Sequence, residues 1–237
     1  MNAIFLILID NSNVTFSRIV RLRNLIGVQV FLFVLLQHNL KAQNEYFFFN
    51  PKIDYGSIGS ANPINLIVND GFEMLGIYSP NRQLSKINFV EKSKYLYNRF
   101  KDPLRDLKAY GFYNLVNDEI IPFNPKKTNL GFFPNYTAHL FAGGYFYAYL
   151  SEYYHYHNYK YPKLMAFTTV YIKNIVNEVI ETPLDYDTKI GHLTDLLFWD
   201  ALAIVTFSSE TVKHFFSNTL SVSNWSPIPV ISPTTRL

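Results

Sequence analysis

The chain of 237 residues contains no cysteine. Disulfide bridges, thiolate zinc sites and cysteine nucleophiles are therefore excluded, and so is lipid attachment through a cysteine. Charged residues are also scarce, at 16% of the sequence, whereas a soluble domain contains about 25%. A chain with so few charges has an unusually apolar surface, which is typical of proteins that lie against a membrane or against other subunits.

Excess positive charge is confined to the start of the chain. The first 42 residues contain one acid, Asp10, and the basic residues Arg18, Arg21, Arg23 and Lys41. Subtracting these from the totals of 21 basic and 18 acidic residues leaves 17 of each sign in the remainder. A neutral body lacks the basic stripe that nucleic-acid binding requires, so nucleic acid is excluded as a partner.

Aromatic residues are abundant, with 18 Tyr and 21 Phe in a chain that is 49% hydrophobic. A chain of this length and composition can fill one globular core but is too short for two comfortable domains. We therefore expect one folded unit.

The N-terminal region has the three parts of an export signal. Three arginines precede the apolar run Leu25–Leu36, and a short polar stretch then ends at Ala42. A spanning helix needs roughly 20 apolar residues, so the shorter run favours a cleaved signal. We predict an N-terminal extension and signal peptide over residues 1–42 and a mature helical domain over 43–237, in the periplasm or associated with the outer membrane. The large side chain of Leu40, three positions before the cut, keeps an uncleaved inner-membrane anchor as the alternative.

Proline breaks and capping residues divide the mature chain into helix-length segments. Asn62-Pro63 and Asp102-Pro103 each place a capping side chain before a proline at the first helical position, and Asn88 with Glu91 matches a capping box. The expected helices span residues 63–76, 89–100, 103–117, 135–157, 162–181, 193–206 and 208–220. We therefore predict an all-α fold, a single bundle of about five to seven helices, with an extended C-terminal tail over Trp225–Pro233.

Two of these helices are apolar on nearly every side, over residues 164–180 and 193–207. Helices of this kind lie in a core or contact lipid. Because charged residues fall inside spans shorter than 20 residues, a core position is favoured over a membrane span.

Polar residues on the apolar helices form the candidate site. Asn174, Glu178 and Glu181 follow the i, i+4, i+7 spacing of one helix face. His192 and Asp195 lie three residues apart around the start of the following helix. At about 100 degrees per residue, Asp200 would lie about 140 degrees round from Asp195, so one α-helical face does not present both.

His139 lies in the first turn of the long helix, four residues before Gly143-Gly144, where small residues predict close approach of a neighbouring helix. We predict that His139, Glu178, His192 and Asp195 converge on one pocket between three helices. One interpretation is a hydrolytic site, with His139, Glu178 and Asp195 as catalytic acid and base, or a metal site with all four as ligands. The other is a satisfied core network in which carboxylates accept hydrogen bonds from histidine. No H-E-x-x-H motif is present, and the sequence specifies no cofactor.

The run Tyr153–His157 contains three tyrosines and two histidines. Such a run is typical of an aromatic helix end at an interface, where the rings are half apolar and half hydrated. A metal-binding strip is the alternative.

Four segments carry a resemblance to a known family: NPINLIVNDGFEML (62–75), PNYTAHLFAGGYFYAYLSEYYHYH (134–157), NEVIE (177–181) and FSSETVKHFFSNTLSVSNWSPIP (207–229). Together they resemble an uncharacterised family of exported proteins in Bacteroidota, over most of the chain beyond Tyr46. The resemblance implies a location in the cell envelope and a strand-rich continuation after the helical part, whereas this chain ends at Leu237. It implies no activity. The order of a histidine, an acid and an aspartate on three helices is also similar to VanZ-like membrane proteins.

These observations favour a noncatalytic envelope protein with a structural or lipid-associated role, whose partner is a membrane surface or an envelope lipid. The alternative is an envelope hydrolase, metal-dependent in one version, that acts on a lipid or glycan. Geometry separates the two. Donor atoms of the four candidate residues within about 5 Å of one another around a solvent-reachable space favour the enzyme, and scattered or sealed positions favour the structural role.

Overall fold

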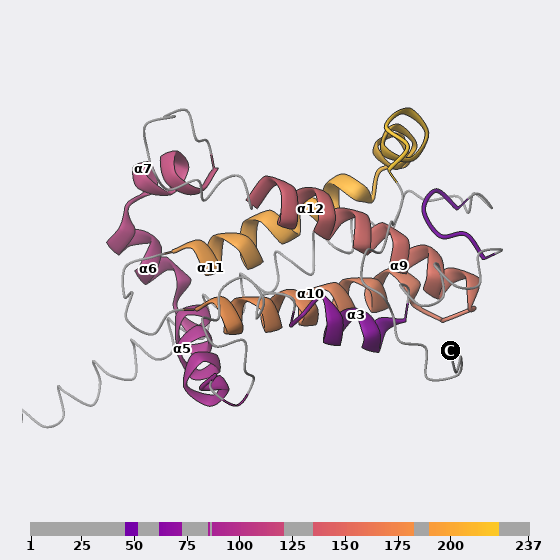
Figure 1. The fold of residues 1–237 in the computed structure, drawn as a ribbon. Coiled ribbons are helices and arrows are strands. Elements are labelled where there is room, and N and C mark those ends of the chain that lie inside the picture. Colours follow the sequence, from indigo (N-terminus) through magenta and orange to yellow (C-terminus); the bar gives the residue numbers. More distant parts are fainter. Residues whose placement is uncertain are drawn as a thin grey trace, which may run out of the picture.

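The computed structural model describes residues 46–51, 62–72, 85, 87–120, 135–182 and 190–222. Every regular element in these ranges is helical and none is a strand, which confirms the all-α prediction (Figure 1). No helix in these ranges combines the length and the apolar character that a membrane span requires. The predicted signal peptide and the predicted extended tail lie outside the described residues.

The described elements follow in chain order, with α for α-helices and η for π-helices. They are α3 (Pro63–Asn69), α5 (Phe89–Lys101), α6 (Pro103–Tyr110), α7 (Phe112–Leu115), η2 (Val116–Ile120), η3 (Asn135–Gly143), α9 (Gly144–Tyr156), α10 (Pro162–Glu181), α11 (Gly191–Thr194), η4 (Asp195–Trp199), α12 (Asp200–Phe207), α13 (Glu210–His214) and η5 (Phe215–Thr219).

The centre of the bundle is built from three rods, each a continuous run of helix: η3 with α9, α10 alone, and α11 with η4 and α12. The first rod packs along α10, and the third packs against both η3 and α9. α3 covers α10, and α5 packs against α10 and α11, while α5, α6 and α7 follow one another at one end of the molecule (Figure 1, left). The candidate site lies where these rods meet.

Helix starts follow the predicted caps. The side chain of Asn62 accepts hydrogen bonds from the backbone N–H groups of Ile64 and Asn65, at 3.0 and 3.2 Å. Asp102 accepts from the N–H of Arg105 at 3.3 Å. Asn88 accepts from the N–H of Glu91 at 3.3 Å and donates from its amide to the Glu91 carboxylate at 2.6 Å. The predicted boundaries of α10 are confirmed at both ends.

Two predicted helices end early, and in both cases the cause is a glycine. The helix expected over 63–76 ends at Asn69, and residues 70–72 form turns and a bend because Asn-Asp-Gly favours a turn over further helix. The helix expected over 103–117 breaks at Gly111, whose φ of 89° lies in the left-handed region. The chain then resumes as α7 and η2.

The core is largely aromatic. Tyr149, Trp199 and Phe207 are almost completely buried, together with Leu150 and Leu196. The predicted close approach at the paired glycines is confirmed, because a Cβ added at Gly144 would lie 2.2 Å from a ring carbon of Phe207. Absence of a side chain at this position therefore allows α12 to lie directly on α9.

The segment before α3 is tied to α9 by one carboxylate. Glu152 accepts hydrogen bonds from the backbone N–H groups of Phe47, Phe48 and Phe49, at 3.2, 2.8 and 2.9 Å. The ring of Phe48 lies 4.9 Å from that of Tyr145. Burial raises the pKa of Glu152 although the three N–H groups act in the opposite direction.

The run Tyr153–His157 does not form a metal cluster. Among the described residues, the only group of potential ligands close enough to share an ion lies elsewhere. Tyr154 is buried and shares a hydrogen bond of 2.8 Å with Thr169, and His155 shares one of 3.3 Å with Tyr46. The alternative of a metal strip is therefore not supported, and the interface interpretation stays a prediction.

We predict that Gly144→Ala lowers the free energy of unfolding by about 1–3 kcal/mol, because the added methyl group overpacks the contact with Phe207. Gly143→Ala is the matched control. A Cβ at Gly143 meets its nearest atoms at 3.7 and 4.0 Å, which is ordinary contact, so we expect it to be neutral or slightly stabilising. Urea unfolding followed by circular dichroism measures both. Equal effects of the two substitutions would contradict the close approach.

Candidate metal centre

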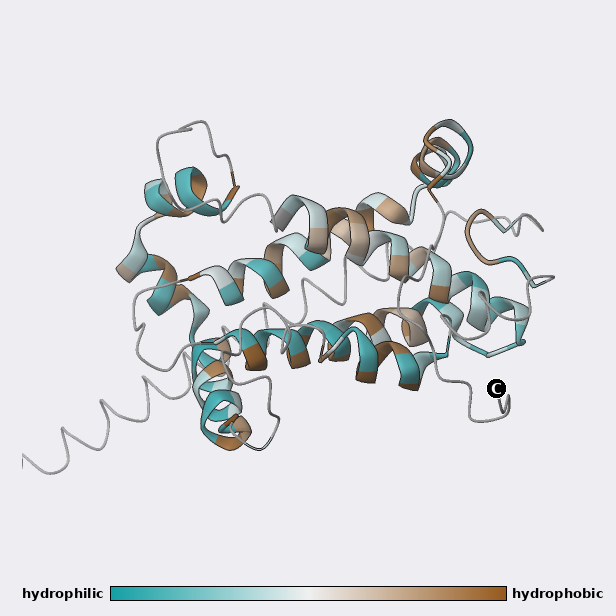
Figure 2. Ribbon diagram, viewed as in Figure 1, coloured by the Kyte–Doolittle hydropathy of each residue, from teal (hydrophilic) through white to brown (hydrophobic). Residues whose placement is uncertain are grey.

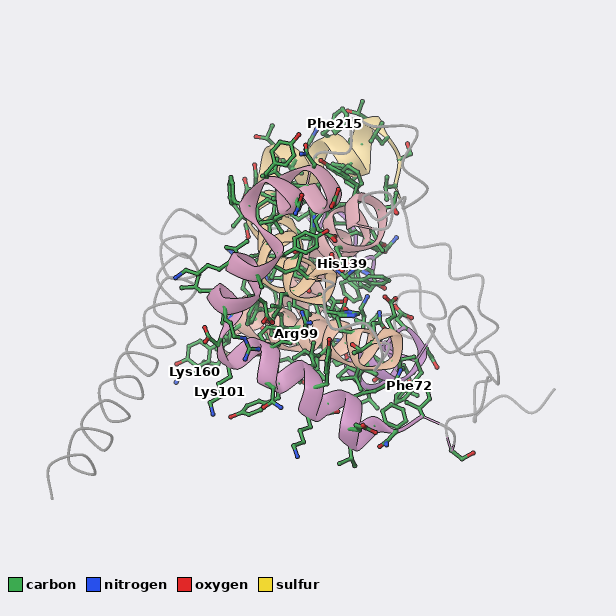
Figure 3. All side chains as sticks on the ribbon, turned by 90° about the vertical axis from the view of Figure 1, so that its left-hand side faces the viewer. Phe72, Arg99, Lys101, His139, Lys160 and Phe215 are labelled. Carbon is green, nitrogen blue, oxygen red and sulfur yellow. The ribbon has the colours of Figure 1, made fainter. Side chains whose placement is uncertain are left out.

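The four candidate residues come from the three central rods. His139 lies in η3, Glu178 in α10, His192 in α11 and Asp195 at the start of η4. Figure 3 shows His139 in the middle of the bundle, away from Lys101 and Phe215 at its periphery. Three of the four, His139, Glu178 and Asp195, come together as predicted, whereas His192 contacts them from outside.

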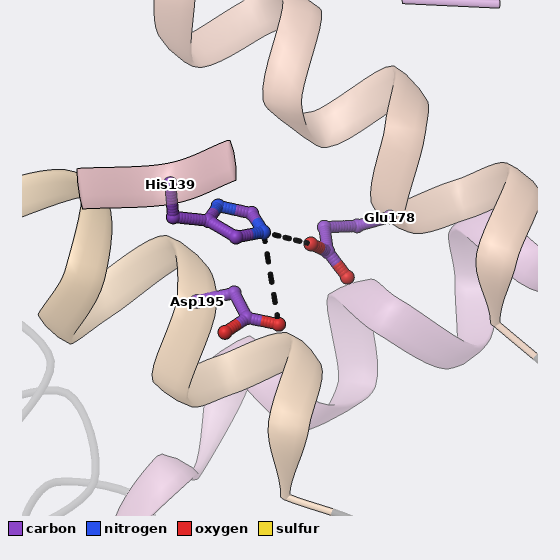
Figure 4. A group of neighbouring side chains, drawn as sticks. All are labelled: His139, Glu178 and Asp195. Carbon is purple, nitrogen blue, oxygen red and sulfur yellow. Dashed lines mark ion pairs between the residues drawn. The ribbon is translucent and has the colours of Figure 1, made fainter. Parts of the chain in front are cut away.

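Three of these residues surround a common point. The Nε2 atom of His139 lies 3.7 Å from Oε1 of Glu178 and 3.9 Å from Oδ2 of Asp195 (Figure 4). One donor atom from each residue lies within 4.8 Å of the others. Side-chain shifts of a few tenths of an ångström would bring three atoms so spaced to the ligand distances of about 2.0–2.3 Å that a metal ion requires.

His192, the fourth candidate, joins the cluster through Glu178. Its Nδ1 atom shares a hydrogen bond of 2.5 Å with Oε2 of Glu178, which is the carboxylate oxygen turned away from the His139 contact. His192 therefore contacts the triangle from outside and does not belong to it.

Asp200 is a member of the cluster that the helical spacing did not predict. Its Oδ1 atom lies 3.0 Å from Nδ1 of His139, and its side chain is 2% exposed. A carboxylate at Nδ1 accepts the proton of that nitrogen. Nε2, which faces Glu178 and Asp195, is therefore the nitrogen that offers its lone pair to a metal ion once the ring loses its second proton.

The expectation that one helix face does not present both Asp195 and Asp200 assumed an α-helix, and the helix between them is not an α-helix. The N–H of Asp200 donates to the carbonyl of Asp195, an i→i+5 hydrogen bond that closes one π-turn over η4. A π-turn contains more residues than an α-turn, so Asp200 lies closer to the face of Asp195 than the α-helical period places it. Both carboxylates therefore reach His139.

π-Helical segments supply several residues of the site. His139 lies in η3, Asp195 in η4 and Glu119 in η2. Segments of this type are rare and are frequently found at functional sites. Glu119 is a second residue that the spacing missed. Its carbonyl accepts from Nε1 of Trp199 at 3.2 Å, and a Cβ at Gly191 would lie 3.8 Å from its carboxylate, which places Glu119 beside α11.

Burial and mutual charge shift the pKa values of the ligands. Burial lowers the pKa of His139, but the hydrogen bond with Asp200 and the charges of Asp195, Asp200 and Glu178 outweigh it and raise this pKa to about 9. Burial raises the pKa of Glu178 to about 8, against the opposing effect of His139. Burial, followed by the charge of Glu178, raises the pKa of Asp195 well above its usual value.

Burial also shifts the pKa values of the neighbouring groups. Burial, with the charge of Glu178 in addition, raises the pKa of Glu181 to about 7. Burial lowers the pKa of His192. Together with Glu119 and Asp200, the acids of this region outnumber its two imidazoles. A region with such an excess holds protons when no cation is bound.

Solvent reaches part of the triangle. The side chains of His139 and Asp195 are 15% and 13% exposed, whereas that of Glu178 is 2% exposed. Within the described residues, Oδ1 of Asp195 and Oδ2 of Asp200 have no hydrogen-bond partner, so the cluster retains acceptor capacity. One imidazole nitrogen and two carboxylate oxygens form a ligand set suited to a divalent first-row ion such as Zn²⁺ or Mn²⁺.

Comparisons of the chain with protein-family models, with curated proteins and with solved structures found no match.

We predict that the stabilising contribution of Glu178 to the metal-free protein falls as pH rises from about 5 to 8. In the folded state the pKa of Glu178 is raised from 4.5 to about 8. Over this pH range the folded protein therefore binds more protons than the unfolded protein, and it loses stability as these protons dissociate. The unfolding free energy of wild type relative to Glu178→Gln should therefore decrease with pH, measured by urea unfolding in the presence of a chelator. Glu91→Gln, at the exposed start of α5, serves as the control with no such trend. A difference that grows with pH would contradict the prediction.

Proposed function

We propose that the protein binds one divalent first-row metal ion through His139, Glu178 and Asp195 and uses it to hydrolyse a substrate of the cell envelope. The observation that supports this proposal most directly is the convergence of three donor atoms, from three separate helical rods, within 4.8 Å of one another. The side chains carrying them lie up to 56 positions apart in the sequence, from His139 to Asp195.

The ligand number supports hydrolysis. Structural zinc sites are closed by four protein ligands, whereas catalytic sites have three and keep a position for water. A bound ion lowers the pKa of that water to about 7 and polarises the bond under attack. The partial exposure of the His139 and Asp195 side chains supports access of water and a substrate group to this position.

The proposed location and substrate class rest on different features. The basic and apolar leader before Ala42 supports export. Exposed apolar side chains on α3 and α10, where Figure 2 shows hydrophobic segments in brown, support contact with a lipid; they are Ile64, Val68, Leu164 and Ile172. A lipid or lipid-linked glycan is therefore the proposed substrate class.

A purely structural network is the second candidate, and a specific observation favours it. His139 is paired with Asp200 and His192 with Glu178, so the buried groups satisfy one another in part without an ion. In this role the cluster holds the three rods in register and needs no metal.

Metal binding separates the two candidates. We expect purified wild-type protein, incubated separately with Zn²⁺ and Mn²⁺ and then dialysed, to retain about one ion per chain by mass spectrometry of its metal content. Glu178→Gln should lose it, because an amide oxygen is a much weaker ligand than a carboxylate. Glu152→Gln is the matched control, since it makes the same change at another buried acid that lies outside the triangle.

Affinity of the wild type for the ion should increase between pH 6 and pH 9, because binding displaces the protons that the cluster holds. Retention of the ion by Glu178→Gln, or failure of the wild type to bind either ion, would contradict the proposed function.

A further inference from the structure

Each of two proposed ligands has a second donor atom that the protein already occupies. His139 has two ring nitrogens, and Asp200 holds Nδ1 at 3.0 Å. Glu178 has two carboxylate oxygens, and His192 holds Oε2 at 2.5 Å. The atoms left over, Nε2 and Oε1, are the two that face each other at 3.7 Å.

We propose that Asp200 and His192 are positioning residues, which fix Nε2 of His139 and Oε1 of Glu178 as the atoms that bind the ion. This inference rests on the proposed function. It goes beyond the proposed function by assigning a role to two residues outside the triangle and by specifying which atoms of His139 and Glu178 bind the ion.

For His139 the choice is between two nitrogens. Asp200 is 2% exposed, and a carboxylate buried this deeply makes a strong charge-assisted hydrogen bond with the Nδ1–H group. The bond fixes the ring orientation and increases the basicity of Nε2, as carboxylate partners of metal-bound histidines do. The π-turn of η4 places Asp200 next to the ligand Asp195, so one turn of helix supplies both a ligand and the partner of another ligand.

For Glu178 the choice is between one oxygen and two. A free carboxylate binds an ion through either one or both of its oxygens. His192 occupies Oε2, so Glu178 binds through Oε1 alone. One coordination position then remains open for water or substrate, in addition to those that the three ligands leave free.

His192 lies within reach of this role because of its place in the chain. It is the second residue of α11, three residues before Asp195, and α11 leads directly into η4. A residue three positions before a ligand on the same rod lies near that ligand's face. Its side chain is 14% exposed, so it borders the solvent-accessible side of the cluster.

The test measures metal affinity and coordination in four variants. Dissociation constants for Zn²⁺ are obtained by competition with a chromophoric chelator, and the number of ligand atoms by X-ray absorption. Asp200→Asn and His192→Ala should weaken Zn²⁺ binding about 10- to 100-fold, while His192→Gln, whose amide still donates to Oε2, should recover most of the loss. Thr169→Val is the control, because it removes a buried hydrogen bond between α10 and Tyr154, nine residues before Glu178 on the same helix.

Coordination distinguishes positioning from general destabilisation. In His192→Ala, release of Oε2 should let Glu178 bind through both oxygens, which adds one oxygen to the coordination shell. Circular dichroism confirms that each variant is folded before titration, and a variant that does not fold is replaced in the comparison by His192→Phe or by Asp200→Leu, which also remove the contact.

Three outcomes are possible. Wild-type binding with weakened variants supports the roles of Asp200 and His192. Wild-type binding with unchanged affinity and unchanged coordination in the folded variants overturns these roles and leaves the proposed function standing. Absence of binding by the wild type overturns both proposals.

Discussion

The buried hydrogen bond between His139 and Asp200, 3.0 Å long, is the contact on which the rest of the cluster depends. It joins η3 to the start of α12, beside Gly143, where a Cβ would lie 4.0 Å from the Asp200 carboxylate. Because it occupies Nδ1, it turns the other ring nitrogen toward Glu178 and Asp195. A longer side chain at Gly144 would move α12 away from α9 and would lengthen this contact.

The cluster is unusual for a protein core because it buries several carboxylates. Taking a carboxylate out of water costs several kcal/mol unless partners compensate it, and here several acids share two imidazoles. The same burial raises the pKa values of Glu178 and Asp195, because it disfavours their charged forms. Replacing such a network by apolar side chains is often neutral or stabilising. A cation bound as we propose would compensate these acids in a chain that is otherwise so poor in charge.

Much of the fold could be predicted because its determinants are local. Pro162 at the first helical position and Pro183 after Thr182 bound α10 at both ends, and three asparagine or aspartate caps start other helices where expected. The four candidate residues were identifiable because they are polar positions on apolar helices. Each of these inferences needs only residues within one or two helical turns.

The features that the sequence did not reveal depend on departures from regular α-helix and on contacts between distant segments. The α-helical period placed Asp200 on the wrong side of Asp195, because no residue pattern marks the π-turn between them. Glu119 was missed because η2 and α11 lie far apart in the chain and meet only in the folded protein. Gly111, with its left-handed backbone, and the turn-forming sequence Asn69-Asp70-Gly71 ended helices whose apolar pattern continued beyond them.

The most direct test of the account is anomalous X-ray diffraction from crystals grown with Zn²⁺ or Mn²⁺, recorded at the absorption edge of the metal. The account predicts one strong peak between His139, Glu178 and Asp195, about 2.0–2.3 Å from Nε2 and from one oxygen of each carboxylate. Well-ordered side chains with no peak at that position, or an ion bound through Nδ1 of His139, would contradict it.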